Sequence, residues 1–419
     1  MSIYIDSKGR VSPEVPDSRS LCGNRKYLFF LFIGLLLLFS PTLRAQINVI
    51  TASGTVSASS IATAFTDCAS GNCEIDVPPS SVWTMSTTIA LTSTESNILV
   101  KCSGRTWNDN GASRGTTTIR WTGGASAMFT LNAVQSFTID GCDIDNTGTG
   151  TKAFSLTGSH DISFKNITMA PTTPWSVSCI QGENTTSANV RIYIEDSYFH
   201  GCGGSNGTID IDRTNIVNIT NTACLFSVAG PSCMRFGNAA ADVNINVLNS
   251  DCETYSTGGA TQHCIDVENA GGTTITGNYC ELDEDGTGTA GQLCLKLASA
   301  TDAQVTGNRF DGGATKTTYL VEDNGGTGVV IKGNLFELCA TSGIHRVSFN
   351  ASSDISLVND LDACSAVMDT VGITATTLLS SAPPNGTIMY CPDCKIVNPC
   401  TSGGNGALAK RLNSTWVCN

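Results

Sequence analysis

A short motif recurs along most of this chain at intervals of 25 to 30 residues. It consists of an apolar residue, any residue, then Gly, Asn or Asp, and an apolar residue or Cys three positions later. Nine copies begin at Ile139, Phe164, Ile194, Ile219, Val247, Ile275, Val305, Ile331 and Leu357. Self-similarity at such a period is typical of a solenoid, in which each repeat stacks on its neighbours.

The third position of the motif predicts a bend in every copy, because Gly, Asn and Asp tolerate left-handed backbone conformations. These residues are Gly141, Asn166, Asp196, Asn221, Asn249, Gly277, Gly307, Gly333 and Asn359. The apolar column that follows the bends comprises Ile144, Met169, Phe199, Cys224, Cys252, Cys280, Phe310 and Phe336. Asp362 interrupts this column in the ninth copy, as expected of a terminal turn.

A second column recurs upstream of the bends, and it alternates as a strand with one buried face does. Its residues are Ile180, Ile209, Met234, Ile265 and Leu295, followed two positions later by Gly182, Ile211, Phe236, Val267 and Leu297. Short strands and bends that repeat every 27 residues or so predict an all-β parallel β-helix of about nine to eleven coils over residues 46–380. A leucine-rich solenoid would need a Leu/Asn consensus, and a propeller would need a longer repeat.

These features resemble the pectate-lyase-like superfamily of right-handed parallel β-helices, which includes pectate lyases, polygalacturonases and phage tailspikes. The resemblance covers about residues 55–370 and rests on the bends Gly277-Asn278, Gly307-Asn308 and Gly333-Asn334, and on the amino-terminal run 60–91. That run looks like the family's capping helix, strand, Pro-containing turn and first coil. Ser60 is placed to cap a helix over Ile61, Ala64 and Phe65. The resemblance implies a fold and not a reaction.

The amino-terminal 45 residues contain an uncharged run, Tyr27–Phe39, that follows Arg25 and Lys26. Thirteen residues match the apolar region of a signal peptide and fall short of the ~20 that span a bilayer. We expect cleavage near Ala45 and a secreted or cell-surface protein, with an uncleaved membrane anchor as the alternative.

Eighteen of the 19 Cys residues follow that run, and an exported chain of this kind is expected to form disulfides. Three pairs flank one loop in consecutive coils and favour loop closure over bonds between stacked coils: Cys224/Cys233, Cys252/Cys264 and Cys280/Cys294. Further expected pairs are Cys68/Cys73 and Cys339/Cys364. Residues 381–419 form a Cys-rich module for capping or association. Its cysteines predict two disulfides, with zinc as the alternative: Cys391, Cys394, Cys400 and Cys418.

The charge of the chain excludes some partners. The formal net charge is −13, and the first 45 residues hold six basic and three acidic side chains, so the remainder carries −16. Such a surface repels phosphate backbones and anionic lipid. We therefore expect no nucleic-acid partner, and membrane contact only through an uncleaved amino-terminal segment.

The candidate site lies on the outward face of the second column. Its first outward row reads Gln181, Asp210, Arg235, Asp266 and Lys296, and its second row contains Glu183, Asp212, Gly237, Glu268 and Ala298. One interpretation is a ladder of salt bridges on a solvated face. The other is an elongated groove for a polysaccharide, with Glu268 and an exposed Trp175 as substrate-binding residues.

Two reactions fit the candidate catalytic residues Asp210, Asp212, Arg235, Asp266 and Lys296. The carboxylates are spaced as in inverting glycosidases, whereas Arg235 or Lys296 could act as the base of a uronate lyase, with Ca²⁺ held by the carboxylates. The loop Asp283-Glu284-Asp285-Gly286 is another candidate Ca²⁺ site. No His or acid motif of the polygalacturonases is present, so no catalytic residue is carried over from the family.

The sequence thus predicts an exported protein that binds, and as an open alternative cleaves, an extracellular polysaccharide. If it is an enzyme, it is a polysaccharide lyase or a glycoside hydrolase. The rival hypothesis is a non-catalytic surface protein, adhesin-like or tailspike-like, and a tailspike-like protein would be a trimer.

Overall fold

The computed structural model describes residues 4–5, 11–12, 46–51, 53–79, 81–102, 117–183, 187–226, 232–238, 241–254, 262–282, 292–313, 319–339, 342–346, 355–357, 359–362, 364, 366–370, 385, 388–391 and 393–419. The chain divides into two compact units, residues 1–45 and 46–419. In the first unit, the described strands β1 (Tyr4–Ile5) and β2 (Val11–Ser12) form an antiparallel pair. The run Tyr27–Phe39 lies outside the described residues, among which no helix is long and apolar enough to cross a membrane.

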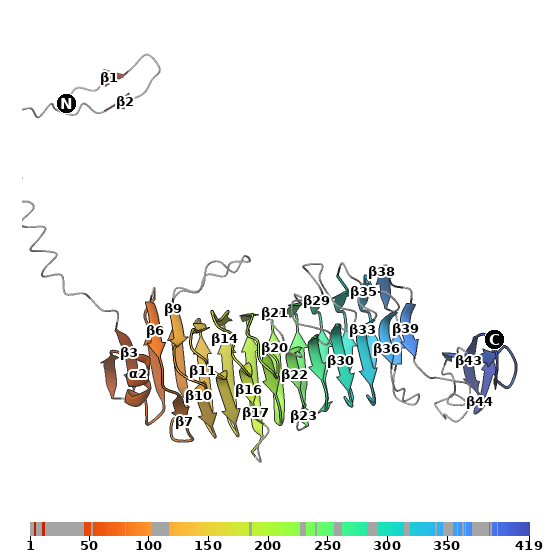
Figure 1. The fold of residues 1–419 in the computed structure, drawn as a ribbon, viewed down its shortest axis with the longest axis horizontal. Coiled ribbons are helices and arrows are strands. Elements are labelled where there is room, and N and C mark those ends of the chain that lie inside the picture. Colours follow the sequence, from red (N-terminus) through yellow and green to blue (C-terminus); the bar gives the residue numbers. More distant parts are fainter. Residues whose placement is uncertain are drawn as a thin grey trace, which may run out of the picture. The chain divides into compact units, whose positions relative to one another are not determined.

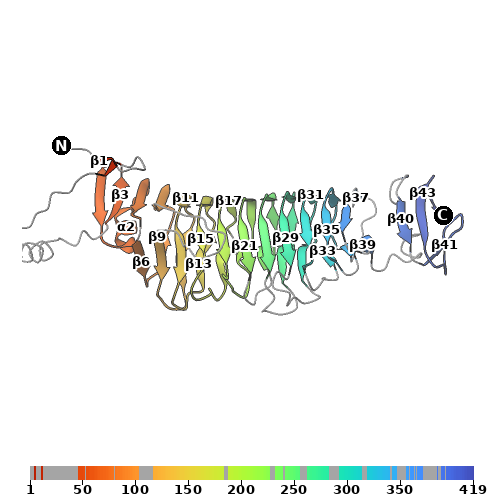
Figure 2. The ribbon, with the colours of Figure 1, turned by 90° about the horizontal axis from the view of Figure 1, so that it is seen from above.

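Three long sheets wind around the core of the second unit, and successive strands of the chain pass from one sheet to the next (Figures 1 and 2). We name them sheets I, II and III. Sheet I comprises β7 (Ile89–Leu91), β10 (Ala127–Asn132), β13 (Lys152–Thr157), β16 (Ser178–Gly182), β19 (Ile209–Ile211), β22 (Ser232–Phe236), β26 (His263–Val267), β30 (Leu293–Ala298), β33 (Tyr319–Asn324), β36 (Ser342–Arg346) and β39 (Ala366–Thr370).

Sheet II begins with two antiparallel pairings and continues in parallel. It comprises β4 (Gly54–Ala58), β3 (Ile47–Thr51), β5 (Cys73–Val77), β8 (Ile98–Cys102), β11 (Gln135–Asp140), β14 (His160–Lys165), β17 (Asn189–Glu195), β20 (Thr214–Thr220), β24 (Ile245–Leu248), β28 (Thr274–Thr276), β31 (Gln304–Thr306), β34 (Val330–Lys332) and β37 (Ile355–Leu357).

Sheet III is parallel throughout. It comprises β6 (Ser81–Met85), β9 (Thr117–Trp121), β12 (Asp143–Asn146), β15 (Thr168–Met169), β18 (Tyr198–His200), β21 (Ala223–Phe226), β25 (Asp251–Thr254), β29 (Tyr279–Leu282), β32 (Arg309–Asp311), β35 (Leu335–Glu337) and β38 (Asp360–Asp362). A short pair, β23 (Asp242–Val243) and β27 (Ala270–Gly271), lies between the ends of sheet I strands and the start of sheet II strands. This topology is the predicted right-handed parallel β-helix.

The predicted columns are confirmed as inward rows of stacked residues. The second column stacks in sheet I, where Ile180 pairs with Ile209 and Ile209 with Met234. The first apolar position of the motif stacks in sheet II, and the column after the bends stacks in sheet III. Positive φ angles occur at the eight bend residues from Gly141 to Gly333, as predicted.

The ninth copy was predicted one residue out of register. Ser356, and not Leu357, pairs with Ile331, and Leu361 pairs with Phe336. Asp362 therefore does not interrupt the inward row, because it pairs with the outward Glu337. The polar Ser356 occupies the first position of the motif, which is apolar in the other copies. The apolar Leu357 beside it fits that position in the sequence pattern, and the predicted register was therefore shifted by one residue.

The amino-terminal cap is also confirmed. Helix α2 (Ile61–Asp67) begins after Ser60, whose side chain accepts a hydrogen bond from the Thr63 amide (3.1 Å). Ile61, Ala64 and Phe65 are buried, and the Phe65 ring lies 5.6 Å from that of Phe129 in the core. The helix thus covers apolar side chains of the first coils.

Nine disulfides join the cysteines of the second unit. Five of them are the predicted pairs: Cys68–Cys73, Cys224–Cys233, Cys252–Cys264, Cys280–Cys294 and Cys339–Cys364. The carboxy-terminal module has the two disulfides expected of it, for which no pairing was predicted: Cys391–Cys394 and Cys400–Cys418. Cys102–Cys142 and Cys179–Cys202 were not predicted.

The second cysteine of each loop-closing bond has a structural role and forms no part of an accessible site. Cys233 and Cys264 lie two residues before Arg235 and Asp266 on the strands of sheet I, so simple alternation would turn them outward as well. Both are nevertheless completely buried. The reason is that they bond to Cys224 and Cys252, which belong to the inward row of sheet III.

The described residues of the carboxy-terminal module form two small antiparallel sheets around a core of their own. One sheet comprises β40 (Ile388–Cys391), β43 (Ala407–Leu412) and β44 (Thr415–Cys418), and the other comprises β41 (Cys394–Lys395) and β42 (Thr401–Ser402). Cys391, Asp393 and Cys394 hold their ligand atoms within 4.8 Å of one another. The two sulfurs are bonded to each other, which leaves no thiolate there for the alternative of zinc.

Candidate functional site

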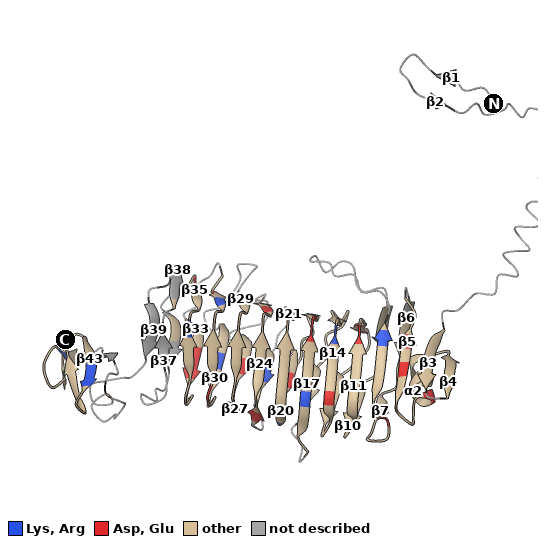
Figure 3. Cartoon of the chain, turned by 180° about the vertical axis from the view of Figure 1, so that it is seen from behind, with Lys and Arg blue, Asp and Glu red and all other residues tan. Residues whose placement is uncertain are grey.

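The predicted outward row of sheet I stands in register in the structure. Asp210 pairs with Gln181 and Arg235, and Asp266 pairs with Arg235 and Lys296. Beyond Lys296 the row continues through Glu322, His345 and Asp369. Charged residues occur on strands along the whole solenoid (Figure 3), but in this row acids and bases alternate from one coil to the next.

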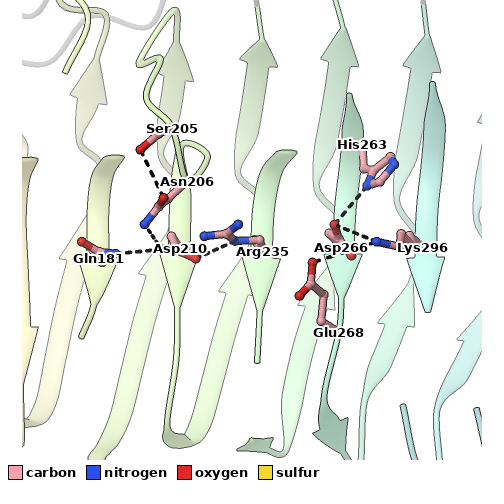
Figure 4. A network of polar contacts seen from close by, with 9 residues as sticks. All are labelled: Gln181, Ser205, Asn206, Asp210, Arg235, His263, Asp266, Glu268 and Lys296. Carbon is pink, nitrogen blue, oxygen red and sulfur yellow. Dashed lines mark hydrogen bonds and ion pairs between the residues drawn. The ribbon is translucent and has the colours of Figure 1, made fainter. Parts of the chain in front are cut away.

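Asp210 is the centre of the first half of the network (Figure 4). Its Oδ1 accepts a hydrogen bond from Arg235 Nε (2.8 Å). Its Oδ2 accepts from Gln181 Nε2 (2.9 Å) and from Asn206 Nδ2 (3.2 Å). Both carboxylate oxygens are therefore occupied by partners from three coils.

Asp266 is the centre of the second half. Its Oδ2 lies 3.0 Å from His263 Nδ1 and 3.8 Å from Lys296 Nζ (Figure 4). Lys296 Nζ is also 4.0 Å from Glu268 Oε1. Asn238 joins the two halves when its amide nitrogen faces Glu268, because it then donates to Glu268 Oε2 (2.6 Å) and accepts from Arg235 Nη2 (3.3 Å).

The face is not solvated as the sequence suggested. The exposed fractions of Asp210, Asp212, Asp266 and Arg235 are 0%, 3%, 2% and 8%. One cause is the segment 201–208, which the Cys179–Cys202 disulfide ties to β16 and which brings Asn206 against Asp210. Backbone hydrogen bonds from Ser205 and Asn206 to residues 176 and 177 hold this segment in place.

Three members of the network remain in contact with solvent. The side chains of Glu268 and Lys296 are 25% and 24% exposed. Asn238, which bridges Glu268 and Arg235, is exposed as well. The accessible part of the candidate site is thus a pair of opposite charges with an amide beside it.

Two acids near this network have raised pKa values. Burial, opposed by a hydrogen bond from the Thr214 amide and aided by the charges of Asp212 and Asp210, raises the pKa of Asp242 to about 8. Burial, followed by the charge of Asp266, raises the pKa of Glu268. Burial and neighbouring carboxyl groups thus favour the protonated forms of Asp242 and Glu268, close to where β19, β23 and β26 end or begin.

The five predicted catalytic residues form no open pair of carboxylates. Asp210 is hydrogen-bonded on both oxygens, Asp266 is buried between His263 and Lys296, and Arg235 is bound to Asp210. What the arrangement can do chemically is hold Glu268 and Lys296 in fixed positions. The acidic loop 283–286, a candidate Ca²⁺ site, lies outside the described residues.

The prediction that Trp175 is exposed is wrong, because its side chain is completely buried. A Cβ atom added at Gly150 would lie 2.4 Å from the Trp175 ring, so Gly150 makes room for the indole in the preceding coil. Trp121 is buried too, whereas Trp107 lies outside the described residues.

Sequence reasoning missed four residues of this region: Asn206, Asn238, Asp242 and His263. All but His263 lie outside the repeated strand positions, so the periodicity could not reveal them. His263 begins a strand three residues before Asp266, and that spacing was the only signal.

A second acidic row, on sheet III, was missed as well. Residues Glu253, Glu281, Asp311, Glu337 and Asp362 pair with one another on successive coils. Arg309 lies beside this row and forms ion pairs with Glu337 and Asp311. The motif spacing could have revealed the row, because each acid follows the apolar column by one residue.

No family model matches the sequence, and no curated protein matches it. Solved structures resemble the chain at low identity. The surface adhesin PfbA of Streptococcus pneumoniae shares 12% identity over 85% of this chain and 95% of its own, with a TM-score of 0.45. The A-module of the Azotobacter vinelandii mannuronan C-5 epimerase AlgE4 shares 12% over 74% and 94%, with a TM-score of 0.43.

The DFA-IIIase of Arthrobacter chlorophenolicus, solved in complex with GF2, shares 14% identity over 68% of this chain and 82% of its own, with a TM-score of 0.42.

The order of the strands in sheets I, II and III places the chain among the right-handed parallel β-helix proteins.

Proposed function

We propose that this protein is an extracellular β-helix that binds a polysaccharide on the outward face of sheet I, with Glu268 and Lys296 at the centre of the contact surface. The observation that carries the proposal is the state of these two side chains. They are partly exposed, and the buried charges of Asp210, Arg235 and Asp266 fix the strands beneath them. Nine disulfides support an extracellular location.

The geometry suits the recognition of hydroxyl-rich chains. A carboxylate accepts hydrogen bonds from sugar hydroxyls, an ammonium group donates them, and the amide of Asn238 does both. Parallel strands repeat such groups at about 4.8 Å along the solenoid. A buried network of charges adds little to stability, so its concentration beneath one exposed pair favours a role in positioning that pair.

Binding is favoured over cleavage. An inverting glycosidase needs an acid and a base that both reach the scissile bond and its water. Asp210 and Asp266 are buried, and Asp210 would have to break its hydrogen bonds to Arg235, Gln181 and Asn206 to reach a substrate. The same bond to Asp210 occupies Arg235 Nε, which opposes its use as the base of a lyase.

The test is a steric block in the second outward row of sheet I. Ala298 lies beside Glu268 in this row, because the preceding residues Val267 and Leu297 are paired. We expect Ala298→Trp to abolish binding to a glycan selected by screening the full chain against neutral, acidic and amino polysaccharides. The matched control is Thr306→Trp, which places the same bulk on β31 of sheet II in the next stretch of chain.

Both variants should unfold at the temperature of the parent protein. Equal binding by the two variants would refute this location of the site. A screen in which no glycan binds would refute the proposed function and favour the rival, a non-catalytic surface protein whose solenoid is a spacer. Release of reducing ends or of unsaturated sugars would show cleavage and refute the preference for binding alone.

A further inference from the structure

We infer that the polysaccharide bound on sheet I carries positively charged amino groups. The inference rests on the proposed function, since it names the chemical class of ligand for the same surface. Three features support it: the balance of charge around Glu268, the unused hydrogen-bonding capacity of the buried Asp266, and the second acidic row on sheet III.

Carboxyl groups outnumber bases in the network and beside it. Four of the acids are Asp210, Asp212, Asp266 and Glu268, and the fifth, Asp242, keeps its proton below about pH 8. The bases are Arg235, His263 and Lys296. Arg235 forms a buried ion pair with Asp210, and His263 contacts Asp266. At the exposed end of the network, Lys296 faces both Asp266 and Glu268, so two carboxyl groups stand against one ammonium group there.

The buried acid Asp266 also holds an acceptor atom that lacks a donor. Its Oδ1 is buried and has no hydrogen-bond partner among the described residues. Asp266 stands beside Lys296. Its charge raises the pKa of Glu268 and is the second-largest cause of that rise, after burial. An ammonium group near Glu268 would be attracted by this field, and it would bring three donors and no acceptor to a site rich in acceptors.

The same coils repel a polyanion on a second face. The acidic row of sheet III consists of Glu253, Glu281, Asp311, Glu337 and Asp362. Along the chain, its strands alternate with β26, β30 and β33 of sheet I. The protein carries a formal charge of −16 beyond residue 45, so its electric field would repel an approaching uronate chain. An amino-bearing chain would approach with it.

The experiment compares three hexasaccharides by titration calorimetry with the full chain: β-1,4-linked glucosamine, its fully N-acetylated form, and galacturonate. The first two differ only in the amino charge. At about pH 6, above the ordinary pKa of a carboxyl group and below that of an amino group, we expect the glucosamine hexamer to bind at least tenfold more tightly than the acetylated hexamer. We expect the galacturonate hexamer to bind most weakly.

Substitutions in the network locate the effect. Glu268→Gln should weaken the binding of the glucosamine hexamer about threefold more than it weakens the binding of the acetylated hexamer. Lys296→Met should strengthen glucosamine binding by a similar factor, a gain that a misfolded variant would not give. The matched control is Glu195→Gln on sheet II, since Glu195 also forms an ion pair with a Lys, Lys165 (3.0 Å). It removes the same charge elsewhere and should change nothing.

The failures are distinguishable. Equal or tighter binding of the acetylated or galacturonate hexamer would overturn the inference while the proposed polysaccharide binding stands. A loss of glucosamine binding in Glu195→Gln as large as in Glu268→Gln would overturn it too, because bulk charge would then explain the preference. If none of these glycans nor any in the wider screen binds, both the inference and the proposed function fail.

Discussion

Replacing Asp210 by Leu tests whether the buried ladder of sheet I acts as a network. Asp210 is fully buried and is the anion that pairs with Arg235, whose exposed fraction is only 8%. Its removal leaves a guanidinium group without its counter-charge in a nearly dry environment. Loss of one partner of a buried ion pair costs about 3–5 kcal/mol, and Gln181 and Asn206 also lose their acceptor. We expect Asp210→Leu to lower the free energy of unfolding by about 4 kcal/mol.

The double variant Asp210→Leu/Arg235→Met separates the charge from the packing. With both charges gone, the desolvation cost of the pair disappears, and apolar side chains of similar volume fill the space. We expect the double variant to recover most of the loss and to lie within about 1 kcal/mol of the parent protein. Adding Arg235→Met to Asp210→Leu should therefore restore about 3 kcal/mol of the free energy of unfolding, and the single variant Arg235→Met completes the double-mutant cycle.

The assay is equilibrium urea unfolding of the oxidised protein, followed by circular dichroism. Glu195→Leu is the control, because its ion pair with Lys165 is largely exposed and should contribute less than about 1 kcal/mol. The reasoning is refuted if Asp210→Leu costs no more than Glu195→Leu, or if adding Arg235→Met makes the protein less stable still. Either result would mean that Asp210 does not neutralise a buried Arg235.

Three further predictions concern stability. Asp242 has a pKa of about 8 in the folded protein, whereas the unfolded chain releases this proton near pH 4. The free energy of unfolding should therefore fall as the pH rises through this window. In thermal unfolding at a series of pH values, Asp242→Asn should flatten that part of the profile. Replacing Cys280 and Cys294 by Ser opens a 14-residue loop and should cost about 3 kcal/mol in urea unfolding, with unchanged circular dichroism. Asn308→Leu removes the side chain that accepts from Asn278 and donates to Asn334 and to the Ile275 carbonyl; we expect a loss of about 2–4 kcal/mol, and a loss below about 1 kcal/mol would contradict the buried ladder.

The inward rows were predictable because one physical requirement sets them in every coil. A residue such as Ile209 must be apolar to lie in the core, and a bend such as Asn221 must tolerate a positive φ. Repetition turns these weak local preferences into a clear pattern. The loop-closing disulfides followed from the same pattern, because their cysteines flank one loop in three consecutive coils. The complete burial of Cys233 and Cys264 did not follow from it, since they share the strand phase of the outward row.

The remaining disulfides show where repetition no longer helps. Cys102 and Cys142 are 40 residues apart, and Cys179 and Cys202 are 23 apart, and neither pair has an equivalent in the next coil. Loops of variable length join the strands, so the spacing of a single pair does not show which ends meet. The phase error at Leu357 has a related cause, since one polar residue in the last copy was enough to shift the match.

The candidate site was predictable in register but not in environment, and the difference decides the function we propose. Alternation along a strand fixes that Asp210 points away from the core, whereas its burial depends on Asn206 and on a segment tied down by Cys202. A solvated row of acids and bases suggests catalysis by carboxylates. In the structure most of this row is buried, and the described residues of the network that reach solvent are Glu268, Lys296 and Asn238. A pair of opposite charges with an amide beside it favours the recognition that we propose over bond cleavage.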